Sequence, residues 1–439
     1  MKRRDFGIVL LAALTEAGCG LFGGGSRKTP LPGERISVLG LDSALTPDPA
    51  LANVSVTLPR PAVNTAWPDA GGYPNHAMYH LALPPAPRRV WETSIGDGSS
   101  RHHKVMAQPI YANKVVYTMD GGAQVSAVDA ASGKLMWQVD LKPKGEHGTA
   151  FGGGPAFWHN RLFIATGWAE VVALDPANGK QIWRKSISAP VHAQPTVSDG
   201  RVFAITVENE MFVLAAEDGR RLWTHNGIPE TAGLLGGAAP AVEGEIVIVP
   251  YNSGELYALR VENGRPLWSD SLAASRTFDP VSGLADIRGR PVIDRDRVFA
   301  IGHSGRMVSI DLRRGDRVWE RDIASSHGPW VAGDYVYVLA NDNELACLTR
   351  KDGKVRWAHQ LPRYEDEKKR EDPIIWSGPV LGGDRLIVLS STGDALAVSP
   401  YTGQPLGRIE ISTRAYIEPM IAESSLYLLT DDANLSAYR

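Results

Sequence analysis

From Arg89 to the C-terminus of this 439-residue chain, hydrophobic and polar positions alternate in short runs. Runs such as RVFAI from Arg201 and MFVLA from Met211 have the length and the β-branched or aromatic content of strands. Turns that contain glycine separate these runs along the whole region. The pattern predicts an all-β body built from many short antiparallel strands.

Seven segments of this region share one pattern: a β-rich stretch, a turn with a glycine, and an aromatic position four residues later, as in AVDAASGKLMW ending at Trp137. A proline lies upstream of each segment. From Pro109 to Pro379, the glycine always follows the proline by 24 residues and the aromatic position by 28. Glycine suits such a turn because tight hairpins often need a positive φ. The constant spacing predicts a structural repeat of four strands.

Four strands in each repeat are typical of a β-propeller blade. An eighth unit opens at Pro419 and holds only three strands before Arg439. The missing strand is at the other end of the repeat region, where Trp91 precedes the first blade proline by 18 residues, an interval found again between later units. We therefore expect an N-terminal strand to complete the last blade, and eight blades to close as one domain over residues 86–439. Length alone would have predicted about three domains.

The tryptophan pattern resembles the repeat of quinoprotein-type (PQQ-type) propellers. In that family the tryptophan packs against the neighbouring blade near the glycine turn, which implies a structural, blade-docking role and no catalytic one. The residues concerned are Trp91, Trp137, Trp183, Trp223, Trp268, Trp319 and Trp357. Gly407 stands at the equivalent position of one unit. Since a large-to-small change in a core is costly, we expect another group to fill that space.

All variation in length lies between the tryptophan position and the next proline. These connections join the outer strand of one blade to the inner strand of the next, so they emerge on one face. The longest are Ser269–Arg290 and Ala358–Gly378. The second contains the mixed-charge run YEDEKKRED, which we interpret as a solvated loop and not as a site. A rigid ring with variable loops on one face is typical of a binding platform.

The N-terminus predicts an export signal. Basic residues from Lys2 to Arg4 precede the apolar run FGIVLLAAL, which is too short to span a bilayer. Small residues then precede Cys19, an order that resembles the bacterial lipobox, although Glu16 replaces the usual Leu or Val. The resemblance implies a lipid-modified (palmitate-bearing) Cys19 as the first mature residue. An ordinary cleaved signal and a cytosolic N-terminus are the alternatives.

Arg3-Arg4-Asp5-Phe6 also resembles part of a twin-arginine signal, so the Sec and twin-arginine export routes both remain open. We assign residues 1–18 to a lipoprotein-type signal peptide and residues 19–85 to a lipidated tether and wrapping segment. The second stretch is rich in Pro, Gly, Ser and Thr. The aromatic residues between Trp67 and Leu81 are less typical of a linker, and we expect them to lie against the propeller.

Composition and motifs narrow the function. A net charge of −3 excludes a strongly basic nucleic-acid binder. Two cysteines are too few for a disulfide framework, and Cys347, in a β-like run, is interpreted as a buried structural thiol. The chain contains no adjacent cysteine pair, CxxCH, EF-hand-like loop, HExxH, GxSxG or P-loop. We therefore predict no enzymatic activity, catalytic residue, metal or cofactor. The alternatives are a PQQ-dependent periplasmic dehydrogenase and a propeller that senses a small ligand in its channel.

The combination of lipobox, tether and eight-bladed propeller resembles the BamB family, the lipoprotein component of the outer-membrane β-barrel assembly machinery of Gram-negative bacteria. The resemblance covers the whole chain, and LPGERISVL from Leu31 resembles the tether of alphaproteobacterial members. It implies a non-enzymatic scaffold, held at the periplasmic face of the outer membrane by its lipid anchor alone. The implied partners are a POTRA domain of BamA, other members of the complex, and unfolded outer-membrane proteins whose folding and insertion it assists.

In that family two neighbouring inter-blade loops bind the POTRA domain. A family segment Leu-Ser-Leu-Arg-Gly aligns with residues 232–236, and Leu-Ser-Asp-Val-Asp aligns with residues 284–288. The resemblance thus implies an apolar anchor rimmed by charge, formed by Leu234, Leu235, Asp286 and Arg288. Leu235 stands where the family has arginine and Arg288 where it has aspartate, so the mode of binding stays open. The alternative is that the two leucines cap the blade core.

Overall fold

The computed structural model describes residues 45–146, 148, 150–191, 193–230, 233–273, 285–411 and 413–439. The chain divides into two compact units, Met1–Ser43 and Ala44–Arg439, and the described residues belong to the second. The predicted signal peptide, Cys19 and the first part of the predicted tether lie outside the described residues, as do Ala232 and Leu284.

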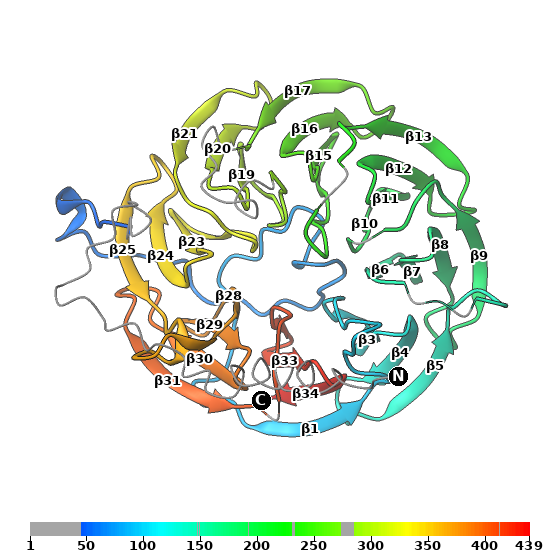
Figure 1. Ribbon diagram of the computed structural model, residues 1–439, viewed down its shortest axis with the longest axis horizontal. Helices are drawn as coiled ribbons and strands as arrows, with labels where there is room; N and C mark the ends of the chain where they lie inside the picture. The colour runs from blue at the N-terminus through cyan, green and yellow to red at the C-terminus, as the bar shows by residue number, and fades with distance from the viewer. Residues whose placement is uncertain are drawn as a thin grey trace, which may run out of the picture. The chain divides into compact units, whose positions relative to one another are not determined.

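Eight four-stranded antiparallel sheets stand around a central axis as the blades of a propeller (Figure 1). Blades 1 to 4 run in chain order from the inner to the outer strand. Their strands are β2 (Ile110–Ala112), β3 (Val115–Met119), β4 (Gln124–Asp129) and β5 (Leu135–Asp140); β6 (Gly153–Trp158), β7 (Arg161–Thr166), β8 (Glu170–Leu174) and β9 (Gln181–Ser186); β10 (Thr196–Ser198), β11 (Arg201–Ile205), β12 (Glu210–Ala215) and β13 (Arg221–Asn226); and β14 (Ala241–Glu243), β15 (Ile246–Pro250), β16 (Glu255–Arg260) and β17 (Pro266–Ser271).

Blades 5 to 7 follow the same order, and blade 8 combines the two ends of the described chain. Their strands are β18 (Val292–Asp294), β19 (Arg297–Ile301), β20 (Met307–Asp311) and β21 (Arg317–Arg321); β22 (Trp330–Ala332), β23 (Tyr335–Leu339), β24 (Glu344–Thr349) and β25 (Val355–Gln360); β28 (Trp376–Gly382), β29 (Arg385–Ser390), β30 (Asp394–Val398) and β31 (Pro405–Glu410); and β32 (Met420–Ala422), β33 (Ser425–Leu429), β34 (Asn434–Tyr438) and β1 (Arg89–Ser94).

Blade 8 closes the ring. Strand β1 pairs antiparallel with β34, with Trp91 opposite Ala437 and Ser94 opposite Asn434. The predicted all-β class, the eight four-stranded blades and the closure by an N-terminal strand are therefore confirmed. The only helix in the described ranges is the single-turn η1 (Pro49–Leu51). No described helix is long and apolar enough to cross a membrane.

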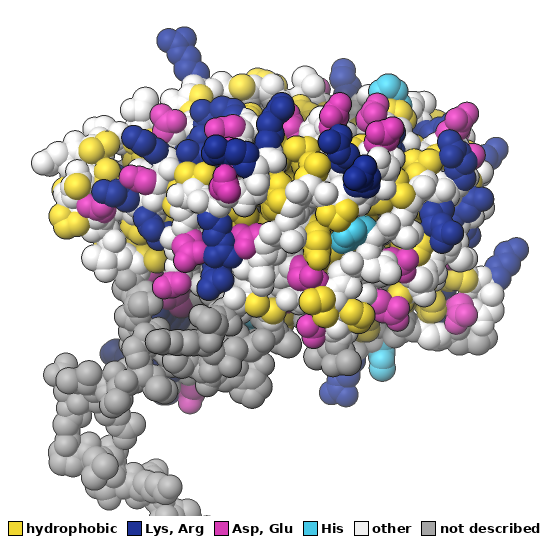
Figure 2. All heavy atoms as spheres, turned by 90° about the horizontal axis from the view of Figure 1, so that it is seen from above, with side chains coloured by type: hydrophobic (Ala, Val, Ile, Leu, Met, Phe, Trp, Pro, Cys, Tyr) yellow, Lys and Arg dark blue, Asp and Glu magenta, His cyan; other side chains and the backbone are white. Residues whose placement is uncertain are grey.

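Burial changes from the middle of each blade to its rim. Middle strands such as β23 and β33 are buried along their whole length, because adjacent blades cover both of their faces. Outer strands such as β5 alternate between exposed and half-buried positions, and Met136 in that strand is 50% exposed. Figure 2 shows hydrophobic side chains interspersed with acidic and basic ones on the rim. The outer strands thus leave apolar side chains in contact with solvent.

Each tryptophan lies over the glycine turn of the next blade. Gly179 has φ +71°, and a Cβ on it would lie 2.8 Å from Cε3 of Trp137. The Trp137 indole Nε1 also donates a hydrogen bond to the backbone oxygen of Pro176, at 2.9 Å. The same ring-over-glycine contact joins Trp91 to Gly133, Trp183 to Gly219, Trp223 to Gly264, Trp268 to Gly315, Trp319 to Gly353, and Trp357 to Gly403.

Gly407 marks the one junction without this contact. Among the described residues, no atom lies within 4 Å of the position that a Cβ on Gly407 would take, so the expected substitute group is not found beside Gly407. The reason is the ring closure. In blade 8 the third and fourth strands, β34 and β1, come from opposite ends of the repeat region. That blade has no glycine turn between them, so a tryptophan from blade 7 would have nothing to pack against.

The mixed-charge run in the connection before blade 7 is more ordered than predicted. It forms a two-stranded antiparallel hairpin of β26 (Tyr364–Asp366) and β27 (Glu371–Pro373). Most of its side chains are exposed, as the sequence suggested. Cys347 in β24 is fully buried, and burial raises the pKa of its thiol far above the usual range. This environment fits the predicted structural thiol.

Candidate functional site

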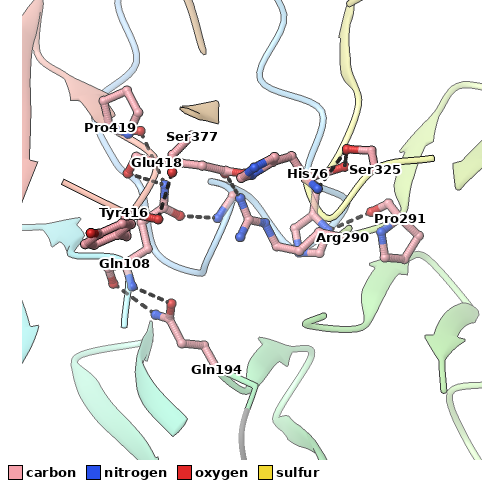
Figure 3. Close-up of polar contacts among 12 residues, drawn as sticks. His76, Gln108, Gln194, Arg290, Pro291, Ser325, Ser377, Tyr416, Glu418 and Pro419 are labelled. Carbon is pink, nitrogen blue, oxygen red and sulfur yellow. Dashed lines mark hydrogen bonds and ion pairs between the residues drawn. The ribbon is translucent and has the colours of Figure 1, made fainter. Parts of the chain in front are cut away.

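Residues that directly precede blade prolines form a polar network at the centre of the ring. Four of these positions are polar, and Figure 3 shows them reaching toward one another from different blades. The Gln108 backbone N–H donates to Oε1 of Gln194 at 2.8 Å, and Nε2 of Gln194 donates to the Gln108 backbone oxygen at 3.0 Å. Gly154, between them, makes this pairing possible because a Cβ there would lie 2.4 Å from Cγ of Gln194.

The other two polar members form an ion pair across the channel. Arg290 binds Glu418 through Nη2 and Oε2, and His327 lies 3.5 Å from the second carboxylate oxygen. Burial opposes ionisation of Glu418, but the Arg290 charge and the contact with His327 outweigh it and hold the pKa at about 2. Nε2 of Gln108 adds a bond to the Glu418 backbone oxygen at 3.2 Å. The charges at the centre are therefore largely compensated within the network.

The two inter-blade loops that hold the predicted partner-binding residues meet on the face from which all these connections emerge, called the loop face below. The Leu234 backbone N–H donates to Oδ2 of Asp286 at 3.0 Å. Asp286 is 1% exposed, and its Oδ1 has no hydrogen-bond partner among the residues that the structure describes. Burial raises the pKa of this carboxyl to about 6, while the Leu234 bond and the Arg288 charge act in the opposite direction. Asp286 thus ties the loop before blade 4 to the loop before blade 5.

The four predicted residues divide into two pairs. Leu234 is half-buried and Asp286 is buried, so together they hold the loops. Leu235 is 43% exposed and Arg288 is exposed, and both line a cavity of about 960 Å³ at the loop-face mouth of the channel. Only the second pair is available to a partner.

This cavity, called the loop-face basin below, carries excess positive charge. Five cationic side chains and three acidic ones line it. Arg290 is paired with Glu418, and Arg363 lies 3.6 Å from Asp342. Three cations have no ion pair or hydrogen bond through their side chains with any residue that the structure describes, and apolar Leu235, Ile375 and Tyr416 are exposed beside them. The three cations are Lys104, Arg288 and Arg414.

The arrangement is suited to binding by charge and apolar contact. Within the described ranges, no group of three His, Cys, Asp or Glu side chains could hold a metal ion. Sequence reasoning missed the central network, although its signal was present: Gln108, Gln194, Arg290 and Glu418 all occupy the position before a blade proline. It also missed Lys104 and Arg414, which lie in loops of variable length.

The fold and the tryptophan junctions define an eight-bladed propeller of the quinoprotein type. The sequence profile described as "Outer membrane protein assembly factor BamB" matches residues 85–144 and 121–359. The chain therefore belongs to the BamB family.

Individual relatives agree with this assignment. The BamB of Yersinia pestis is 27% identical over 304 residues, which cover 68% of this chain and 76% of that protein. The BamB of Salmonella typhimurium is 26% identical over 356 residues, covering 80% of this chain and 88% of that protein.

Solved structures show the same fold. BamB from Moraxella catarrhalis superposes with a TM-score of 0.69 at 18% identity, covering 81% of this chain and all of that one. The quinohemoprotein alcohol dehydrogenase of Comamonas testosteroni gives a TM-score of 0.65 at 13% identity, covering 86% of this chain and 81% of that one. At such identities the likeness concerns the fold alone.

Proposed function

We propose that this protein is a non-enzymatic scaffold for the assembly of outer-membrane β-barrel proteins. In this proposal it is anchored through Cys19 at the periplasmic face of the outer membrane. It docks onto a POTRA domain of a BamA-like subunit through its loop face. Membership of the BamB family supports the role, and the names of its relatives as assembly factors support the pathway.

One observation supports the docking site above all: the hydrogen bond between the Leu234 backbone N–H and Asp286, which holds two inter-blade loops together at the rim of the basin. These are the loops that correspond to the partner-binding loops of the family. With the loops fixed, Leu235 and Arg288 both line the basin and are open to a partner. A rigid pair of this kind loses little conformational entropy on binding.

The basin predicts the chemistry of the docked surface. An exposed leucine supplies an apolar anchor, and Lys104, Arg288 and Arg414 attract acidic side chains. The partner surface should therefore present an apolar patch beside one or more carboxylates. We also propose that the protein binds unfolded outer-membrane proteins, and we assign no site on the propeller to them.

Co-purification with the assembly subunit from solubilised membranes tests the docking site. Leu235→Asp combined with Arg288→Glu should abolish it, because the pair replaces the apolar anchor and reverses a charge in the basin. Leu267→Asp is the matched control, since Leu267 is 38% exposed on the rim, and it should leave co-purification unchanged. Unchanged co-purification of the folded double variant would refute this site. Asp286 is not substituted because its buried carboxylate holds the loop.

The dehydrogenase alternative rests on the likeness of fold alone, and no residue of the basin favours it. Incubation of the purified protein with pyrroloquinoline quinone and calcium should give neither a bound chromophore nor dye reduction with alcohols. A stable chromophore with dye reduction would reverse the proposal that the protein is not an enzyme.

A further inference from the structure

Residues 62–82, which we call the channel segment, run as a loop inside the ring of blades, within the blue part of the chain in Figure 1. The segment has no repeat pattern, and within the described residues it pairs with the sheets in β fashion only at isolated bridges. It nevertheless reaches the inner strand of every blade. It thus behaves as a separate extended chain held along the channel wall.

The hydrogen bonds to blades 1 to 5 follow the register of the repeat. In each of these blades the residue two positions after the blade proline donates its backbone N–H to the channel segment, at 2.7–3.0 Å. Because the inner strand is an edge strand, this N–H has no partner within its own sheet. The donor and acceptor residues are Tyr111 and Trp67, Phe157 and Pro68, Val197 and Asp69, Val242 and Pro74, and Ile293 and Asn75.

The remaining three blades are contacted through other groups. The Asn64 side chain donates to the backbone oxygen of Ile421 in blade 8 at 2.8 Å. Nε1 of Trp330 in blade 6 donates to the backbone oxygen of Tyr79 at 2.7 Å. In blade 7, the Gly383 N–H donates to Leu81 at 2.8 Å. Read along the segment, the blades are met in the order 8, 1, 2, 3, 4, 5, 6, 7, which is one complete turn.

The two ends of the segment then meet. The Ala62 N–H donates to the backbone oxygen of His80 at 2.9 Å, and the Ala82 N–H donates to that of Ala62 at 2.8 Å. The closed loop separates the loop-face basin from a second cavity of about 830 Å³ on the opposite face. None of the described residues lines both cavities.

Side chains add specificity to the backbone contacts. Trp67 is fully buried and stacks on Trp330, with ring centroids 6.4 Å apart. His76 is bonded through Nδ1 to the backbone oxygen of Pro291 at 2.7 Å. The Gly71 N–H donates to Oε1 of Gln108 at 2.7 Å, which joins the segment to the central polar network.

From this geometry we infer that the inner edges of the eight blades form a binding site for an extended polypeptide, and that residues 62–82 are its ligand on the same chain. The site binds the segment through its register of inner-strand N–H groups, four of which donate to backbone oxygens and one to the Asp69 carboxylate, and it recognises sequence through the contacts of Trp67 and His76. The connection to β1 passes through exposed Pro85 and Ala86, and Arg385 of blade 7 donates to the backbone oxygens of Pro84 and Pro85. The inference does not depend on the proposed docking to an assembly subunit.

The test breaks the covalent link and leaves the full chain present. A site-specific protease sequence is inserted between Pro85 and Ala86, the protein is purified intact, and it is then cleaved. We expect the N-terminal fragment to co-elute with the propeller in gel filtration. A fluorescent synthetic peptide of residues 60–84 should exchange slowly for it. Trp67→Ala should speed release of the fragment by on the order of a hundredfold.

Val63→Ala is the matched control, because Val63 lies in the same segment but is 60% exposed. It should change the release rate by no more than about twofold, as expected for a surface substitution. Release of the wild-type fragment on cleavage would overturn the inference, whether the propeller stays folded or unfolds by circular dichroism. Equal release rates for Trp67→Ala and the wild type would refute the assigned contacts.

Discussion

The inner edges of the blades are covered by another segment of the chain, whereas most outer edges face solvent. At the inner edges, the channel segment takes up backbone N–H groups that would otherwise face the channel. At the outer edges, the residue before the tryptophan position is an exposed aliphatic side chain in six blades, 38–54% accessible. These residues are Val90, Met136, Ile182, Leu267, Val318 and Leu406. Water can hydrate an outer edge, whereas the inner edges converge in a confined channel, so the inner edges need a polypeptide partner.

Blade 6 supports this interpretation, because it is the one blade without an aliphatic residue at this rim position; in blade 3 the equivalent Leu222 is half-buried. Arg356 stands at the position of the exposed aliphatic residues, and its Nε donates to the backbone oxygen of Val54 at 2.6 Å. The Asp48 N–H donates to the Val355 oxygen at 2.8 Å, and Lys354 pairs with Asp48 at 3.0 Å. The N-terminal residues thus cover one outer edge before they enter the channel, and there the aliphatic residue is absent.

The largest expected effect contrasts the two edges directly. Trp67→Ala should lower the free energy of unfolding by about 3–5 kcal/mol, because it removes a fully buried ring and leaves a cavity against Trp330. Val318→Ala on the rim should change it by less than about 0.5 kcal/mol. Chemical denaturation followed by circular dichroism measures both. Similar losses in the two variants would remove the contrast between the edges.

The channel should also respond to acid through His76. Burial, with a further contribution from Arg290, lowers the pKa of its imidazole to about 3, against about 6.5 when unfolded. The folded state therefore binds fewer protons between these values, and stability is lost as pH falls below about 6.5. His76→Asn keeps a donor near Pro291 and tolerates the φ of +61° at this position.

Between pH 7 and pH 4.5 the wild type should lose about 2–3 kcal/mol relative to the Asn variant. Burial raises the pKa of Asp69 well above its usual range, so that carboxyl gives the opposite pH dependence. Because Asp69 is present in both proteins, its contribution cancels in the comparison. Parallel stability–pH curves for the two proteins would contradict a buried neutral His76.

The smallest of these effects concerns how the outer strands are fixed. Gly179→Ala should cost about 1–3 kcal/mol, since its φ is +71° and the added Cβ would meet the Trp137 ring. Gly407→Ala should be neutral within about 0.5 kcal/mol, because nothing lies within 4 Å of the added atom. Thermal unfolding of the two variants provides the comparison. An equal cost at Gly407 would mean that the open junction between blades 7 and 8 is wrongly described.

The fold could be predicted because the sequence features that specify it recur at constant spacing. The constant distance from proline to glycine to tryptophan fixes strand order within a blade, and the unmatched Trp91 identifies the strand that closes the ring. The open junction at Gly407 was also implicit, since the last unit has no glycine turn. The pattern within one repeat does not reveal it, because it depends on blade 8, whose third and fourth strands come from opposite ends of the repeat region.

The path of the channel segment could not be predicted in the same way. Its contacts join residues far apart in sequence, such as Asn64 with Ile421 and His76 with Pro291, and no periodicity relates them. The sequence did indicate that Trp67 and its neighbours lie against the propeller. The sequence also does not show which residues of the candidate site fix the loops and which are exposed to a partner. The burial of Asp286 depends on how two loops fold onto each other.

The closed turn of the channel segment changes where the folding unit begins. The repeats start near residue 86, and a fragment cut there would contain every blade strand, β1 included. It would nevertheless expose the amides of Tyr111, Phe157 and three further inner strands, together with the apolar surface that Trp67 covers. Such a fragment should be poorly soluble. A soluble version of this propeller therefore has to start before Ala62, some way upstream of its first repeat.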